Sequence, residues 1–168
     1  MPIDPYRFLD FATREIIKAW VSREARHPQP IPWTPMAKPL SECTVALVST
    51  AGVARRDDRP FDQERERRDP WWSDPTHRLI PHGATERDVR LYHLHIDTRF
   101  GARDLDVVLP MRRLGELATA GYVGRAADTH YSIVGYQLRT EVLERETAPA
   151  MLADMKKRGV DAVVLIPA

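Results

Sequence analysis

Two nearly continuous apolar runs, TVALVS at residues 44–49 and VDAVVLI at 160–166, constrain the fold of this chain more than any other feature. A strand that is apolar at almost every position is typical of a parallel sheet with helices on both faces. The second run follows an expected helix at 146–158 and Gly159, a succession that forms the second half of a βαβ unit. The sequence therefore predicts an α/β fold with a central, largely parallel sheet flanked by helices, and a buried final strand.

The segment at 54–75 has a different character, because it is dense in charged residues and holds three prolines without a clear period. This composition indicates a long surface loop, and such loops in compact domains are often functional. Trp71 and Trp72 are its strongest expected anchors, and we expect both to contact a substrate. The other expected elements are strands at 88–97, 105–109 and 131–136 and a helix at 110–121.

The N-terminal region is predicted to be separate in character from the rest. Apolar residues recur at three- and four-residue spacing over 5–26, which predicts an amphipathic helix whose apolar stripe covers either its own domain or a second subunit. Five prolines at 28–39 then predict an extended strap, for which a proline-rich ligand of a partner groove is the alternative. We expect an N-terminal helix and strap over 1–40 and one α/β domain over 41–168.

Composition and simple motifs exclude several classes of function. Lys and Arg total 25 against 24 Asp and Glu, so the formal net charge of +1 does not favour a nucleic-acid partner. No apolar run approaches the roughly 20 residues of a membrane span, and no secretory signal begins the chain, so a cytoplasmic protein is expected. The single cysteine, Cys43, is expected in the core. The sequence contains no glycine-rich phosphate loop, so no nucleotide cofactor is expected.

The segment YHLHID carries the most specific chemical signal. In a strand, His93, His95 and Asp97 would project from one face, because side chains at i, i+2 and i+4 share a face. With His130 they would form a set of ligands suited to a divalent transition metal such as Zn, Fe, Mn or Cu. Two alternatives remain open: polar residues on the wet face of an edge strand, and a metal-free site in which the histidines bind an anion or act as acid and base.

Several longer strings occur in order between about Phe8 and Pro167. They are PIPWTPMAKPLSECTVALVSTAGV, DPTHRLIP, the H-x-H-x-D segment followed by DLDVVLPMRRLGELATAGYVG, HYSIVGY, and ETAPAMLADMKKRGVDAVVLIP. Together these strings resemble the selenoprotein B family of glycine, sarcosine, betaine and D-proline reductases. The resemblance covers nearly the whole chain.

The resemblance implies an α/β fold and, for classical members, reductive cleavage of a carbon–nitrogen bond. In those members a selenocysteine or cysteine directly after the last strand attacks a substrate activated by a pyruvoyl-bearing partner subunit. This sequence ends at Ala168, where that motif would begin, so we expect a short member without the redox motif. The segments that carry over are the one from His93 to Asp97 and the HYS segment with His130, Tyr131 and Ser132.

Two functional hypotheses follow. The first is an enzyme acting on a small molecule, in which His93, His95 and His130 serve as metal ligands or acid–base groups. In this hypothesis the substrate contacts are Trp71, Trp72, Tyr131 and Ser132. The second is a non-catalytic or half-catalytic subunit that docks a partner carrying the redox residues; a homodimer or a partner reductase subunit is the expected assembly. A truncated piece of a longer chain is a third hypothesis.

Overall fold

The structure is a computed structural model that describes residues 11, 14–15, 18–19, 21–22, 34–69 and 71–168. Backbone contacts divide the chain into two compact units, Met1–Pro35 and Met36–Ala168, and both described sheets belong to the second. Most of the helix expected at 5–26 and the first half of the proline-rich strap lie outside the described residues. None of the described helices is long and apolar enough to cross a bilayer.

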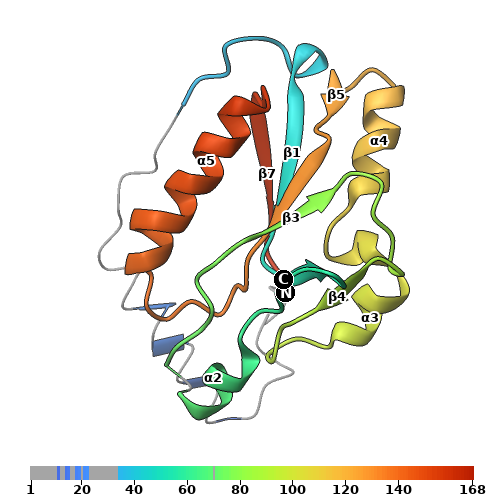
Figure 1. Ribbon diagram of the computed structural model, residues 1–168. Helices are drawn as coiled ribbons and strands as arrows, with labels where there is room; N and C mark the ends of the chain where they lie inside the picture. The colour runs from blue at the N-terminus through green and yellow to red at the C-terminus, as the bar shows by residue number, and fades with distance from the viewer. Residues whose placement is uncertain (1–10, 12–13, 16–17, 20, 23–33, 70) are drawn as a thin grey trace. The chain divides into compact units, whose positions relative to one another are not determined.

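Strand β1 (Thr44–Ser49) is the centre of the main sheet. From Val45 to Ser49 it pairs in parallel with β7 (Ala162–Ile166), and its other edge pairs in parallel with β5 (Arg125–Ala126) and then with β6 (Thr129–Ser132). Strand β3 (Arg78–Pro81) pairs antiparallel with β6 and closes that side. The predicted α/β fold with a largely parallel central sheet is confirmed (Figure 1).

The side chains of β1 alternate between two cores, which is why every residue of the strand is buried. One core includes residues of helix α4 (Met111–Thr119) and the other includes residues of helix α5 (Ala148–Lys157), drawn on opposite sides of β1 in Figure 1. The helices expected at 110–121 and 146–158 are thus confirmed. The first core includes Cys43, Val45, Leu47, Met111 and Leu114, and the second includes Ala46, Val48, Tyr131, Met151 and Met155.

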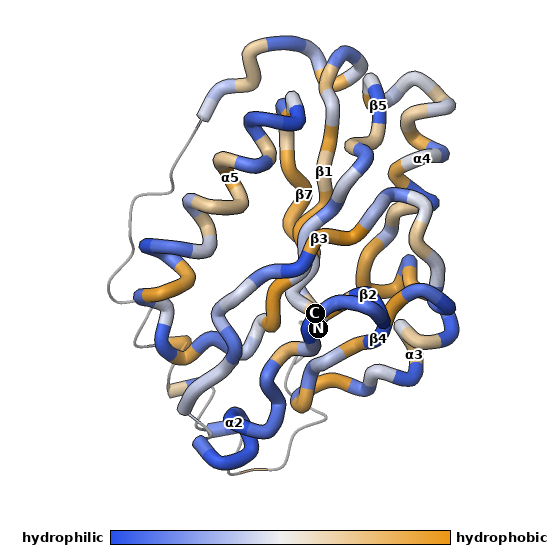
Figure 2. The backbone as a smooth tube through the Cα atoms, in the orientation of Figure 1, coloured by the Kyte–Doolittle hydropathy of each residue, from blue (hydrophilic) through white to orange (hydrophobic). Residues whose placement is uncertain are grey.

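The final strand is present, but the expectation that it is buried is wrong. Val163, Val164 and Leu165 are 39%, 45% and 71% exposed. The reason is topological: among the described residues β7 pairs with β1 alone, so one edge of the strand carries no neighbour. Figure 2 shows β7 as an apolar strand beside β1. The apolar composition was enough to predict the strand. It could not indicate that the strand lies at the edge of the sheet, because composition does not show which strands are neighbours.

The charged segment at 54–75 is more ordered than its composition predicts. It contributes to β2 (Val53–Arg55) and forms helix α2 (Gln63–Arg68), whose first turn is capped by Asp62 accepting a hydrogen bond from the Arg65 N–H at 2.9 Å. Figure 2 shows α2 as strongly hydrophilic. The expected anchor Trp71 is 67% exposed, and Phe61, at 2%, is the buried aromatic residue of this segment.

Two further strand predictions are wrong. The segment at 88–97 is a strand only over β4 (Val89–Leu91), which pairs antiparallel with β2 in a second, two-stranded sheet. The apolar run at 105–109 begins with a 3-10 turn (Leu105–Val107), because Asp104 accepts a hydrogen bond from the Asp106 N–H and turns the chain. The strand expected at 131–136 is β6, which ends at Ser132 and is followed by one isolated bridge at Val134. Helix α3 (Thr98–Arg103) and short helical segments at Leu40–Glu42 and Leu143–Thr147 complete the elements of this unit.

Candidate functional site

The chain turns immediately after β4, so His93, His95 and Asp97 do not share a strand face. The imidazole Nδ1 of His93 accepts a hydrogen bond from the backbone N–H of His95 at 3.1 Å. Asp97 caps helix α3 (Thr98–Arg103) by accepting from the Arg99 N–H, and its carboxylate binds the Arg99 guanidinium at 2.7 Å. Hydrogen bonds from Arg99 lower the pKa of Asp97 to about 2. Because of these local hydrogen bonds the segment is not a strand. The prediction that His93, His95 and Asp97 project from one strand face depended on that strand.

His95 instead pairs with a carboxylate from helix α2. Its Nε2 lies 2.8 Å from Oε1 of Glu66, a residue only 4% exposed, whose other oxygen accepts a hydrogen bond from Ser73 Oγ at 3.3 Å. The ring of His95 stacks on Tyr136 with centroids 3.8 Å apart. The imidazole is therefore held by a buried carboxylate at one nitrogen and by an aromatic ring on its face. We call Glu66 and His95 the Glu66–His95 pair.

The open side of this pair is the part that can act on another molecule. The side chain of His95 is 43% exposed, and no described residue hydrogen-bonds its Nδ1. Because Glu66 accepts the Nε2 proton, Nδ1 is a base in neutral His95 and an acid in the imidazolium. An imidazole oriented by a carboxylate, with its second nitrogen accessible, is a standard arrangement for proton transfer.

His93 lies beside His95 but has a different environment. It is 6% exposed, and burial, with a smaller effect of His95, lowers its pKa to about 4. His93 is therefore neutral at pH 7, and since its Nδ1 accepts the His95 N–H, its proton resides on Nε2. That buried Nε2 has no hydrogen-bond partner among the described residues. His93 thus supports the backbone of His95 and does not exchange protons near neutral pH.

Backbone hydrogen bonds link the segment that carries His95 to the residues that follow the carboxyl ends of β1 and β6. Tyr92, next to His93, donates its N–H to the Gly52 carbonyl at 2.8 Å, and Gly52 donates its own N–H to Ile133 at 2.9 Å. Gly52 has φ +64°, and a Cβ there would lie 2.3 Å from the Tyr92 oxygen. Only glycine allows this approach. Ligand sites of open α/β sheets commonly lie at the carboxyl ends of the strands.

His130 lies in a second cluster and is not joined to His93 or His95. Strand β1 changes partner from β5 to β6 near Leu47, and the N–H of Leu47 donates to His130 Nδ1 at 3.1 Å instead of to a backbone carbonyl. The other ring nitrogen of His130 lies 2.8 Å from Nδ1 of His82, at the end of β3. Burial is the larger cause, and His82 the smaller, of the lowering of the His130 pKa to about 4.

The four residues expected to bind a metal are therefore distributed over separate environments. Within the described part of the chain, no group of three or more His, Cys, Asp or Glu side chains is arranged to hold a metal ion. His130 uses both ring nitrogens, His95 uses Nε2, and Asp97 is bound to Arg99. The geometric argument for a metal site, which required His93, His95 and Asp97 on one strand face, no longer holds.

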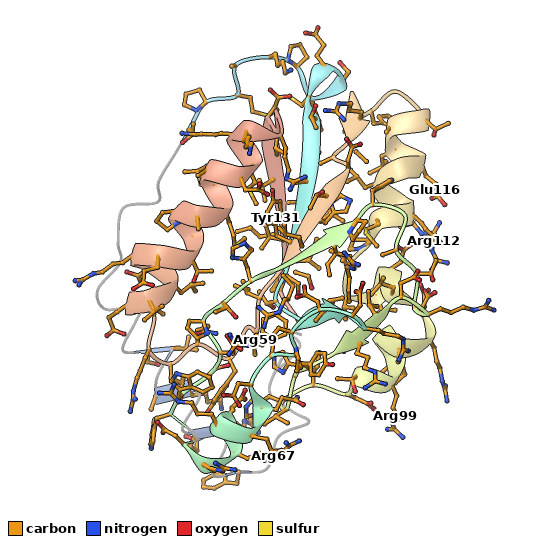
Figure 3. All side chains as sticks on the ribbon, viewed as in Figure 1. Arg59, Arg67, Arg99, Arg112, Glu116 and Tyr131 are labelled. Atoms are coloured by element: carbon orange, nitrogen blue, oxygen red, sulfur yellow. The ribbon has the colours of Figure 1, made fainter. Side chains whose placement is uncertain are left out.

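The residues expected to contact substrate also have other partners. Tyr131 is fully buried and its hydroxyl donates to Asp154 of α5 at 2.8 Å, so burial and Asp154 together raise its pKa (Figure 3). Ser132 is fully buried and its Oγ accepts the Val53 N–H at 2.8 Å. The Trp72 ring carries the Arg65 guanidinium 4.1 Å above its centroid, whereas Trp71 is exposed.

Sequence reasoning missed Glu66 and Tyr136 and gave His82 little weight. Glu66 lies in the charged run QERERR, where nothing local distinguishes it from Glu64. The one usable signal is Asp62, a helix-capping residue type four positions before Glu66. A helix starting there orients one glutamate of the run toward the protein, but its partner His95 is 29 positions away in the sequence.

Comparison with known proteins agrees with the fold. The glycine/sarcosine/betaine reductase selenoprotein B family matches residues 24–168. The chain is 30% identical over 138 residues to the D-proline reductase subunit gamma of Acetoanaerobium sticklandii, which covers 82% of this chain and 53% of that protein. It is likewise 30% identical over 138 residues to the glycine reductase complex component B subunit gamma of Carboxydothermus hydrogenoformans, covering 80% of this chain and 30% of that protein.

No solved structure matches the chain. The chain spans about half the length of the first of these curated relatives and under a third of the second. The family match extends over most of the sequence, including all of the α/β unit and the two histidine clusters. The chain belongs to the glycine/sarcosine/betaine reductase selenoprotein B family.

Proposed function

We propose that this chain is a subunit of a reductase complex in which His95, oriented by Glu66, transfers protons at a small-molecule substrate. The observation that carries the proposal is the 2.8 Å contact between His95 Nε2 and the buried Glu66 carboxylate, with the opposite ring nitrogen accessible. The position of this pair at the carboxyl ends of the parallel strands supports it. Family membership supports the assignment to reductase chemistry.

The proposed reaction is reductive cleavage of a carbon–nitrogen bond with a dithiol as the reductant. The carbon–nitrogen bond breaks, carbon and nitrogen each gain a hydrogen, and the dithiol loses two electrons and two protons to become a disulfide. Charged His95 gives a proton to the leaving nitrogen and then regains one from a thiol. General acid catalysis of this kind typically contributes about 10²–10⁴-fold to a rate.

The dithiol must come from outside this sequence as given. Cys43 is the single cysteine, it is 1% exposed, and its Sγ lies 3.3 Å from the Pro39 carbonyl in the first core. One buried thiol cannot form an intrachain disulfide. In this proposal a partner subunit supplies the redox residues, and both relatives described above are named as subunits of reductases.

The second candidate is a subunit that docks such a partner without taking part in proton transfer. The same family membership favours this second candidate. The two candidates differ only in whether the Glu66–His95 pair transfers protons. The metal hypothesis for His93, His95, Asp97 and His130 stays a prediction. Metal content per chain, measured by plasma mass spectrometry on untagged protein beside a His93→Ala/His95→Ala variant, tests it directly.

The decisive experiment measures product amine by NMR with dithiothreitol as reductant. The chain is assayed alone and together with co-purified products of neighbouring genes, using glycine, sarcosine, betaine and D-proline as substrates. We expect activity only in the complex, a loss of about 10²–10⁴-fold in kcat for His95→Gln, and a smaller loss for Glu66→Gln. If His95→Gln is as active as the wild type in an active complex, the docking role is correct and the proton-transfer role is wrong.

A matched control is Glu64→Gln, an exposed glutamate of the same helix that pairs with Arg67. It should leave kcat unchanged. The conservative change Glu66→Asp should retain more activity than Glu66→Gln, because it keeps a carboxylate for His95 Nε2. A purely structural role of Glu66 would instead make the activities of both variants follow their melting temperatures.

A further inference from the structure

Strand β4 pairs with β2 along one edge, and the described residues place no strand on its other edge. At the two ends of the β2–β4 ladder, the Asp88 carbonyl accepts and the Tyr92 N–H donates a hydrogen bond toward β2, at 2.9 and 2.8 Å. Alternate residues of an antiparallel strand direct their backbone groups to opposite edges, so Arg90 also bonds toward β2. The N–H and C=O groups of Val89 and Leu91 therefore point to the free edge.

These outward backbone groups have no partner within the part of the chain that the structure describes. No hydrogen bond joins the N–H or C=O of Val89 or Leu91 to any described residue outside the ladder. Backbone donors and acceptors require partners, which only water or another chain can supply here. A strand edge in this state is a template for pairing with another extended segment.

The free edge of β4 borders a half-open cleft of about 280 Å³. All three residues of β4 line one wall of the cleft, and residues of helix α3, including Thr98 and Ala102, line another. Figure 1 shows β4 and α3 next to each other. Because side chains alternate between the two faces of a strand, a wall made by three successive residues is the edge of that strand. The cleft therefore lies where a further strand would pair with β4.

The charged residues of the cleft favour an acidic ligand group. They are Arg56, Arg90 and Glu86, which sum to one positive charge. Glu86 already accepts the Leu105 N–H at 2.7 Å and lies 3.6 Å from the Arg112 guanidinium, so its charge is partly balanced. Arg90 is exposed and forms no ion pair with a described residue. A carboxylate in the cleft is therefore attracted, and an ammonium group is repelled.

The geometry of the edge determines where that carboxylate would lie in a paired segment. In antiparallel pairing, the residue opposite Arg90 has its side chain on the same face as Arg90. Its two neighbours lie opposite Val89 and Leu91 and exchange backbone hydrogen bonds with them. The side chains of these neighbours lie on the other face, on which Val89 and Leu91 pack into the first core. The edge therefore favours one acidic residue between two apolar ones.

We propose that the free edge of β4 is a docking site for an extended segment of a partner protein, in which an acidic residue opposite Arg90 is flanked by two apolar residues. Backbone hydrogen bonds supply affinity in this mode of binding, and alternate side chains supply specificity. Three observations carry the proposal: the unpaired backbone groups, the cleft beside them and the positive charge of its lining. The site does not depend on proton transfer by the Glu66–His95 pair.

The test is an NMR titration of the full chain at pH 7 that follows the backbone amides of Val89 and Leu91. The probe is the blocked peptide acetyl-TVEVT-amide, and we expect saturating shifts of both amides with a Kd below about 1 mM. The TVKVT peptide should bind at least about fivefold more weakly. TVEVT with both valines N-methylated should bind at least about tenfold more weakly, because it lacks the two donors. Absence of saturation, or equal binding of either altered peptide, would overturn the proposal.

Charge reversal at Arg90 tests the register directly. Arg90→Glu should bind TVKVT at least about fivefold more tightly than TVEVT, the reverse of the wild-type preference. Arg90→Gln should bind TVEVT and the neutral TVQVT peptide equally. Both variants should keep the wild-type melting temperature, since the Arg90 side chain is exposed. An Arg90→Glu variant that still prefers TVEVT would contradict the pairing.

The matched control is Arg68→Gln, which removes an exposed arginine of helix α2 that does not line the cleft. It should leave the Kd for TVEVT unchanged. A rise equal to that for Arg90→Gln would show a general effect of surface charge and would overturn the site. Sedimentation velocity without peptide checks a second copy as the occupant. Self-association that Arg90→Glu abolishes would place a second copy at this edge and would overturn the assignment to a partner protein.

Discussion

The two histidine clusters use the same side chain under opposite conditions. In the His82–His130 cluster, His130 is fully buried and both of its ring nitrogens are hydrogen-bonded, one to the backbone of β1. In the Glu66–His95 pair, the carboxylate is buried while the imidazole is 43% exposed and keeps one nitrogen accessible. Both residues are histidines, so the residue type does not distinguish them. The comparison shows that a histidine with both ring nitrogens hydrogen-bonded is structural, whereas one with an accessible ring nitrogen is able to exchange protons.

The largest expected difference between the clusters is in stability. His130→Ala removes a buried ring and leaves the Leu47 N–H without an acceptor, so we expect a loss of about 4 kcal/mol in the free energy of unfolding. His95→Ala removes a half-exposed ring, and we expect a loss below about 1 kcal/mol. Urea denaturation of both variants measures the difference. Equal losses would contradict the structural assignment of His130.

The support of the Glu66–His95 pair can be broken without changing a histidine. Gly52→Ala places a methyl group against the Tyr92 carbonyl and forces a side chain into φ +64°, so we expect a loss of about 3 kcal/mol. The ring signals of His95 should shift in NMR spectra, whereas those of His130 should not. Gly83→Ala, where a Cβ would meet nothing within 4 Å, is the control for the loss of a glycine.

Acid should weaken both clusters through their buried rings. The pKa values of His93 and His130 are lowered to about 4, against 6.5 when exposed, so between these values the unfolded chain binds protons that the folded chain does not. The stability these rings contribute is complete above pH 6.5 and is lost as the pH falls toward 4.

His93→Asn isolates one of these contributions, because Asn can accept the His95 N–H but does not titrate. Between pH 7 and pH 5 the variant should lose less unfolding free energy than the wild type, by on the order of 2 kcal/mol. Urea titrations at four pH values give both curves. Parallel curves for the two proteins would show that His93 titrates normally in the folded state.

The smallest expected effect concerns Asp97. Asp97→Ala removes the cap of α3, which should lower the melting temperature only slightly, and should leave the substrate chemistry unchanged because this carboxylate is bound to Arg99. Circular dichroism melts and the amine assay check the two parts. A loss of activity comparable to that of His95→Gln would restore Asp97 to the site.

Local pattern was sufficient for the framework of the fold. The apolar run of β1 determined a strand buried on both faces, and helical spacing with a following glycine determined α4 and α5. Strings spread over the chain also sufficed for the family. Cys43 could be placed in the core because a small apolar residue at the start of a buried strand has few other environments.

Tertiary structure alone decided the site. The alternation in YHLHID is real in the sequence, but the hydrogen bond from the His95 N–H to His93 and the capping role of Asp97 turn the chain before a strand can continue. Glu66 meets His95, and His82 meets His130, across 29 and 48 residues of sequence. Periodicity in the sequence indicates which face of a helix or strand is apolar. It contains no information on which distant side chain forms a hydrogen bond with a given histidine.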